Sequence, residues 1–202
     1  RVVYYRVFSD VGPLGPGEDD AQAWDHLRRT LEPRGRGVWV TSAADHLPDW
    51  IGPGGALSLA LELHDVLVHG GAEAYLYYQF ADDEPAVALT RSTDTRAPKY
   101  AAFKQYSRFI RPGAVRVHAS PDGAALPVAA FWHEADAALT VVLVNRESES
   151  IRAGLRTGSA PLAVFISDAE RRCDPAGVLR PVDGRIELEI PAKSVVTLQT
   201  AR

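Results

Sequence analysis

The sequence pattern changes around Pro112, and this change constrains the fold more than any other feature. Before it, long segments with apolar residues at helical spacing alternate with short apolar runs. After it, short apolar runs are separated by turns rich in Gly, Pro and Asp. The two patterns predict an α/β part over residues 1–112 and an all-β part over residues 113–202.

The first part predicts strands and helices that alternate three times. We expect Asp19 or Asp20 to cap the first helix, His64 to face the core from the second, and Pro112 to stop the third. A complete (β/α)8 barrel needs about 250 residues, so three units predict the last strands and helices of a TIM-type barrel. The expected strands are Val2 to Phe8, Gly37 to Thr41 and Ala74 to Phe80.

The second part predicts an appended antiparallel β-sandwich of about eight short strands. Apolar and charged side chains alternate over residues 185–190, which is typical of a strand with one face in water. The clearest strands are expected at Val128 to His133, Leu139 to Asn145, Ile151 to Arg156, Leu162 to Ser167, Arg185 to Ile190 and Ser194 to Thr200.

Composition excludes several classes of protein. The net charge of −4 disfavours a nucleic-acid partner, and no apolar run approaches the length of about 20 residues that crosses a membrane. The single cysteine, Cys173, excludes an intrachain disulfide and a thiolate metal cluster. Methionine is absent even at position 1, so we expect a processed piece or a segment of a longer protein.

Neither cofactor nor metal is expected. The glycine-rich runs at residues 12–17 and 52–55 lack the spacing of a phosphate loop or a dinucleotide fingerprint, which favours turns. His64 and His69 are five residues apart, so a regular helix would place them on different faces. The sequence therefore predicts no metal site.

Carboxylates gather where the predicted strands end. In barrels of this type, chemistry takes place at the carboxyl ends of the strands, and paired carboxylates perform glycoside hydrolysis. Tyrosines in the third strand offer aromatic faces to sugar rings, although Tyr77 and Tyr78 cannot point the same way. The strand-end acids are Asp10, Asp45, Asp82, Asp83 and Glu84.

Residues 99–113 read KYAAFKQYSRFIRPG and resemble the last barrel helix of glycoside hydrolase family 30 where it enters the sandwich. In this family of clan A, a (β/α) barrel is fused to a β-sandwich. Residues 60–65 and 74–78 look like its seventh helix and eighth strand. Residues 142–146 and 191–197 resemble late sandwich strands. The resemblance begins at about Gly37 and implies a C-terminal part, a glycan ligand and secretion.

The resemblance also places a substitution at the centre of the expected site. The family's seventh strand ends in Trp-x-Thr-Glu, whose Glu is the nucleophile. Here the run is Trp39-Val40-Thr41-Ser42, so Ser42 occupies the nucleophile position. The acid/base Glu belongs to the fourth strand, outside this chain, and Tyr78 replaces a frequent Trp. The resemblance thus implies that Trp39 and Tyr78 contact the substrate.

A retaining mechanism needs two carboxyl groups about 5–5.5 Å apart, and a serine needs a base to become a nucleophile. We therefore expect this chain alone to be inactive, with a glycan-binding or supporting role. Two alternatives remain open. One is an active O-glycosyl hydrolase that uses another strand-end acid such as Asp45. The other is a non-catalytic interaction module that docks through the open edge of its sheet.

Overall fold

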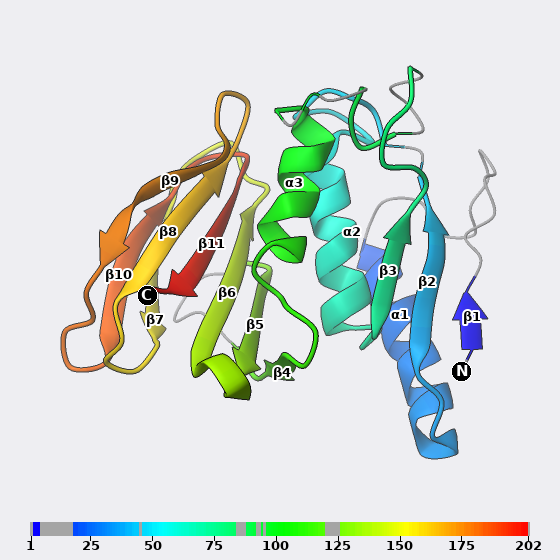
Figure 1. Ribbon diagram of the computed structural model, residues 1–202, viewed down its shortest axis with the longest axis horizontal. Helices are drawn as coiled ribbons and strands as arrows, with labels where there is room; N and C mark the ends of the chain where they lie inside the picture. The colour runs from blue at the N-terminus through cyan, green and yellow to red at the C-terminus, as the bar shows by residue number, and fades with distance from the viewer. Residues whose placement is uncertain are drawn as a thin grey trace.

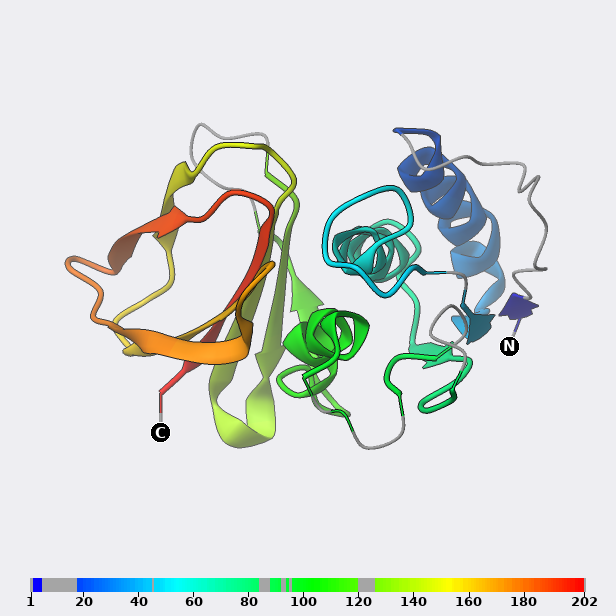
Figure 2. The same ribbon diagram turned by 90° about the horizontal axis from the view of Figure 1, so that it is seen from above.

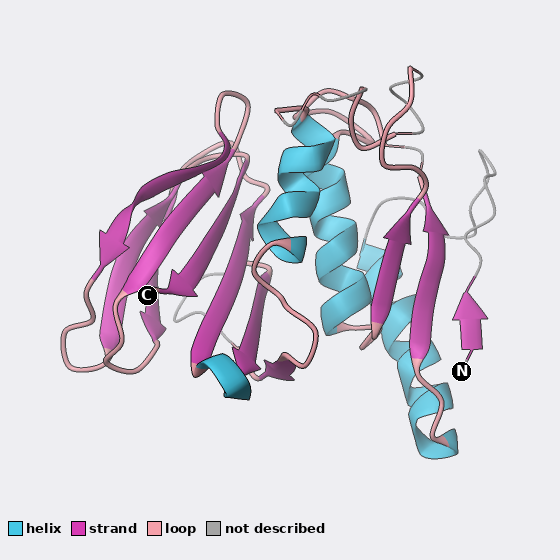
Figure 3. Cartoon of the chain, viewed as in Figure 1, coloured by secondary structure: helices cyan, strands magenta, loops and turns pink. Residues whose placement is uncertain are grey.

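The computed structural model describes residues 2–4, 18–44, 46–83, 88–91, 94, 96–119 and 126–201. A small parallel sheet with three helices is followed by two antiparallel sheets (Figures 1 and 3). The first part contains β1 (Val2–Tyr4), α1 (Glu18–Leu31), β2 (Val38–Ala43), α2 (Ala56–Val68), β3 (Ala74–Tyr77) and α3 (Pro98–Ser107). The second contains β4 (Val115–Val117), β5 (Val128–His133), β6 (Ala138–Asn145), β7 (Ile151–Arg156), β8 (Leu162–Ser167), β9 (Arg172–Leu179), β10 (Arg185–Ile190) and β11 (Ser194–Thr200).

The parallel sheet has the order β1-β2-β3, and α1 and α2 make the two crossovers. Helices α2 and α3 lie between this sheet and the antiparallel sheets, whereas α1 lies farther from the antiparallel sheets (Figure 2). Helix α1 begins at Glu18, so the prediction that Asp19 or Asp20 caps it was wrong. Both acids belong instead to the first turn of the helix.

Strand β3 and helix α3 end earlier than the sequence predicts. After Tyr77 the chain leaves the parallel ladder, and the carbonyls of Gln79 and Phe80 accept hydrogen bonds from the amides of Leu89 and Thr90. This local pairing within the segment that follows β3 replaces the predicted last residues of the strand. Helix α3 ends at Ser107, several residues before the predicted stop at Pro112.

The six predicted strands of the second part are confirmed, and the structure adds β4 and β9. The larger sheet has the order β4-β5-β6-β11-β8-β9, and β10 pairs with β7 in the smaller one. Strand β9 carries Pro175 and Gly177, which weaken a sequence-based strand prediction. It lies at the edge of its sheet, where a proline without an N–H group is tolerated.

The central part of the six-stranded sheet is buried on both faces. In β6, Val141 and Leu143 join the core shared with β7 and β10, whereas Val142 and Val144 join the core shared with α2 and α3. Burial on both faces explains why β6 reads as a continuous apolar run. In β10 the outer residues Glu187 and Glu189 are exposed, which confirms the predicted wet face.

Hydrogen bonds join the helical layer to the antiparallel sheet. Trp50, in the loop after β2, donates its indole N–H to the Lys193 carbonyl at 2.6 Å. On α3, the buried Gln105 donates to the Ser167 hydroxyl at 2.8 Å, and the Thr197 hydroxyl donates to the Gln105 carbonyl at 2.8 Å. The two parts of the chain therefore share a core and a set of polar contacts.

Candidate active site at the ends of the parallel strands

Ser42 lies near the carboxyl end of β2, where the pairing of β2 with β3 is irregular. Val40 pairs with Tyr75 and Ala43 with Tyr77, so β2 uses one residue more than β3 over this stretch. A bulge of this kind re-aims side chains and is frequent beside active sites. Ser42 is partly buried, and the amide of Tyr78 donates to the Ala43 carbonyl at 2.7 Å. Ser42 and Tyr78 therefore belong to the same end of the sheet.

Among the described residues, the face of the sheet away from the helices is open. Leu76 is 50% exposed and Tyr78 53% exposed, whereas Tyr75 and Tyr77 pack against the helices. The prediction that Tyr77 and Tyr78 point to opposite sides is confirmed. The Tyr78 ring thus presents an aromatic surface at the strand ends.

Trp39 lies at the other end of the strands. It pairs with Ala74, the first residue of β3, and donates its indole N–H to the Glu73 carboxylate at 3.1 Å. Tyr78 follows four residues after Ala74, a rise of about 13 Å along a strand. The structure therefore brings Ser42 and Tyr78 to one end of the sheet and Trp39 to the other.

Two of the five strand-end acids lie among the described residues. The Asp82 carboxylate accepts a hydrogen bond from the Gln79 side-chain amide, and Asp83 is exposed. Asp10, Asp45 and Glu84 lie outside the described residues. The edges of the parallel sheet are β1 and β3, which is the geometry on which the interaction-module hypothesis rests.

A buried polar cluster lies behind the strand ends, on the helix side of the sheet. The Glu62 carboxylate accepts a hydrogen bond from the Tyr75 hydroxyl at 2.9 Å and lies 3.4 Å from Nε2 of His46. The Lys99 ammonium donates to the His46 carbonyl at 2.8 Å. Tyr75, the hydrogen-bond partner of Glu62, points away from the open face. Glu62 therefore belongs to this buried cluster and does not contact a ligand at Tyr78.

Sequence reasoning missed Glu62 and Lys99 as members of a cluster. Each carried a signal. Glu62 interrupts an apolar run in α2, and Lys99 lies in the first turn of α3, where the helix dipole disfavours a cation. A charged residue at such a position is expected to have a tertiary partner.

The structure corrects the prediction that His64 and His69 lie apart. His64 is buried, as predicted, but its ring centroid lies 5.8 Å from that of His69. Helix α2 ends at Val68, and His69 is its C-terminal cap. A helical side chain leans toward the N-terminus, so His69 reaches back over Asp65, beside His64.

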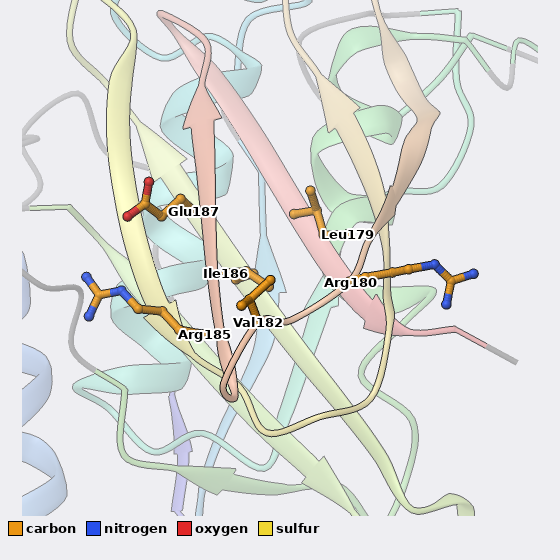
Figure 4. Close-up of a pocket in the computed structure, with 6 residues that line it drawn as sticks. All are labelled: Leu179, Arg180, Val182, Arg185, Ile186 and Glu187. Carbon is orange, nitrogen blue, oxygen red and sulfur yellow. The ribbon is translucent and has the colours of Figure 1, made fainter.

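A separate pocket of about 380 Å³ lies in the sandwich, next to the turn between β9 and β10. Figure 4 shows that the side chains of Arg180 and Arg185 extend away from each other, with Val182 and Ile186 between them. None of its six lining residues is aromatic. The polar groups do not converge on one point, so the pocket lacks the arrangement that orients a small ligand.

No family model matches the chain, but it is similar to curated proteins and to solved structures. The glucuronoxylanase XynC of Bacillus subtilis strain 168 is 24% identical over 181 residues, which are 83% of this chain and 40% of the relative. A GH30 endoxylanase from Clostridium papyrosolvens C71 matches with a TM-score of 0.75 and 19% identity, over 89% of this chain and 46% of that structure. The catalytic domain of GH30 xylanase C from Talaromyces cellulolyticus matches with a TM-score of 0.71 and 27% identity, over 82% of this chain and 41% of that structure.

The fold and these similarities define a glycoside hydrolase-like protein. More particularly, the chain resembles the C-terminal part of the family 30 glycoside hydrolases. It spans about two fifths of the length of the curated relatives that it matches. Among the described residues, no helix has the length and apolar character required to cross a lipid bilayer.

Proposed function

We propose that this chain contributes one wall of a glycan-binding site and that Ser42 leaves it without the family's nucleophile. In this proposal residues 1–112 are the last strands and helices of a (β/α)8 barrel, and residues 113–202 are the appended sandwich domain. The ligand is a β-linked glycan of the xylan class, the class named in the relatives. The chain alone does not hydrolyse it.

The parallel order β1-β2-β3, with helices on one face, supports the barrel interpretation. The other face carries Leu76 and Tyr78, each about half exposed. Barrel strands direct apolar side chains of this size inward, where the remaining strands would cover them.

The bulge at the end of β2 is the observation that carries the proposal. It lies between Val40 and Ala43, so it re-aims the chain at the position where the family resemblance places the nucleophile. Ser42 supplies a hydroxyl there, whereas the retaining mechanism needs a carboxylate that attacks the anomeric carbon. The Tyr78 ring, at the same end of the sheet, offers a face on which a sugar ring can stack.

The test uses the complete protein, with glucuronoxylan as the probe. We expect binding in affinity electrophoresis, about tenfold weaker binding after Tyr78→Ala, and no effect of Trp132→Ala, which removes a partly exposed aromatic ring from the sandwich. Equal binding by the Tyr78→Ala protein would contradict the proposed glycan contact.

Reducing-sugar release tests the role of Ser42. We expect none from the native protein and measurable release after Ser42→Glu, with Thr41→Glu as the neighbouring control that stays inactive. Hydrolysis by the native protein would show that another carboxylate acts as nucleophile. An inactive Ser42→Glu protein that still binds glucuronoxylan would contradict the account based on the missing nucleophile.

A further inference from the structure

Three metal-ligating side chains converge at the carboxyl-terminal end of α2. They are His64, Asp65 and His69, and one ligand atom from each lies within 4.8 Å of the other two. Nε2 of His69 is 3.9 Å from Oδ1 of Asp65. From this geometry we propose that the three side chains bind a divalent transition-metal ion of the zinc class.

The donor set matches this class of ion. Zn²⁺ binds imidazole nitrogens and carboxylate oxygens at about 2.0–2.2 Å, with its ligands close to a tetrahedron. Ligand atoms around such an ion are about 3.4 Å apart, so the present spacing must contract by little more than 1 Å. The His69 side chain is 39% exposed and has room to make this movement, while His64 and Asp65 stay in the helix. Water completes the coordination.

His64 is the buried member of the site, and its chemistry supports a ligand role. The residue is only 6% exposed, and its Nδ1 atom has no hydrogen-bond partner in the structure. Buried polar atoms are normally satisfied, so an orphaned imidazole nitrogen calls for a partner. A neutral imidazole is the form that coordinates metals.

The charges around the site set the affinity. Arg28 of α1 donates to the His69 carbonyl at 3.1 Å, but its guanidinium is also paired with Asp25 and Glu32. Arg116 of β4 acts as a positive charge on both imidazoles, so it opposes a bound cation. We therefore expect moderate affinity that rises when Arg116 loses its charge.

The place of the site indicates a structural role. The parallel strands run with their carboxyl ends toward the top of Figure 1, whereas α2 ends at the bottom, close to the start of β3. The site thus lies at the end of the sheet opposite Ser42. A metal ion there would fix the end of α2 and stabilise the fold, and this inference does not depend on the proposed glycan function.

The experiment is a Zn²⁺ titration of the complete protein at pH 7, after treatment with a chelator, in competition with a chromophoric zinc indicator. We expect one ion per chain and a rise in melting temperature. His69→Ala and, independently, Asp65→Asn should weaken binding at least about tenfold and abolish the thermal shift. Arg116→Gln should tighten binding by about threefold.

The matched control is His118→Ala, which removes an exposed histidine outside the cluster and should leave both readouts unchanged. Circular dichroism confirms that each variant is folded. The inference is overturned if the native protein binds no Zn²⁺, or if His69→Ala and Asp65→Asn bind as tightly as the native chain. An equal loss in His118→Ala would also overturn it, because it would indicate nonspecific binding by surface histidines.

Discussion

The Lys99 ammonium donates a hydrogen bond to the backbone carbonyl of His46 at 2.8 Å, across 53 positions of the sequence. Lys99 is only 2% exposed, and its ammonium also lies 5.7 Å from the centre of the Tyr77 ring. The contact ties the first turn of α3 to the loop that follows β2. The segment just after Ser42 is thus held by a buried cation.

Lys99→Met should therefore destabilise the protein. The substitution keeps most of the volume of the side chain but leaves the buried His46 carbonyl without this donor, which lowers the free energy of unfolding by about 1–3 kcal/mol. Chemical denaturation measures the change. Lys104→Met, on the same helix and partly exposed, should change it by less than about 0.5 kcal/mol, and equal effects of the two variants would contradict the role of the Lys99 contact.

Trp50→Phe should weaken the attachment of the helical layer to the sandwich. The indole is 4% exposed and donates to the Lys193 carbonyl at 2.6 Å, a bond that phenylalanine cannot make. We expect a loss of about 1–2 kcal/mol in the free energy of unfolding, measured by urea denaturation. Trp132→Phe is the matched control, because Trp132 is 36% exposed and bonds to the exposed Glu134. An equal loss of unfolding free energy in both variants would contradict the expectation that the buried hydrogen bond of Trp50 stabilises the protein more than the exposed one of Trp132.

Asp168 should make stability depend on pH. Partial burial raises the pKa of its carboxyl, but hydrogen bonds from the Arg171 side chain and from the amides of Arg171 and Glu170 outweigh this effect and hold the pKa below its ordinary value. A carboxyl with a lowered pKa in the folded state stabilises the protein above its unfolded pKa, and this stabilisation is lost as the pH falls through the folded value.

Asp168→Asn should accordingly lower the free energy of unfolding by about 1–2 kcal/mol at pH 7. The difference from the native protein should shrink as the pH falls from the ordinary titration range of Asp through the lowered pKa of folded Asp168, because the native carboxylate is then progressively protonated. Urea denaturation between pH 7 and pH 3 checks this, with the exposed Glu170→Gln as the control. A difference that stays constant with pH would exclude the charge of Asp168 as its cause.

Ile190→Ala should create a cavity in the sandwich core. Ile190 is fully buried in the cluster between the two antiparallel sheets, and the deletion of such a side chain lowers the free energy of unfolding by about 2–5 kcal/mol. Its neighbour in β10, Glu189, is exposed, so Glu189→Ala should change stability by no more than about 0.5 kcal/mol. Thermal unfolding of the two variants measures the contrast, and similar melting temperatures would contradict the burial pattern of β10.

The confirmed predictions rest on local patterns. Alternation and turn residues located six sandwich strands, and helical spacing placed His64 in the core. Strand β9 was missed because Pro175 and Gly177 are unfavourable in strands. These residues are tolerated because β9 lies at the edge of its sheet, which only the tertiary structure shows. Local patterns succeed where neighbours in the chain decide the structure.

The sequence by itself determined the order of the elements and the resemblance to glycoside hydrolase family 30. Only the tertiary structure decided which segments pack against each buried residue. It shows that β6 contacts a different core on each face, and that Lys99 donates to the carbonyl of His46. It also brought His69 back over Asp65, beside His64, at the end of a helix where regular spacing no longer applies. The reason is physical: periodicity reports that a side chain is buried, whereas its partner comes from a distant segment that periodicity does not encode.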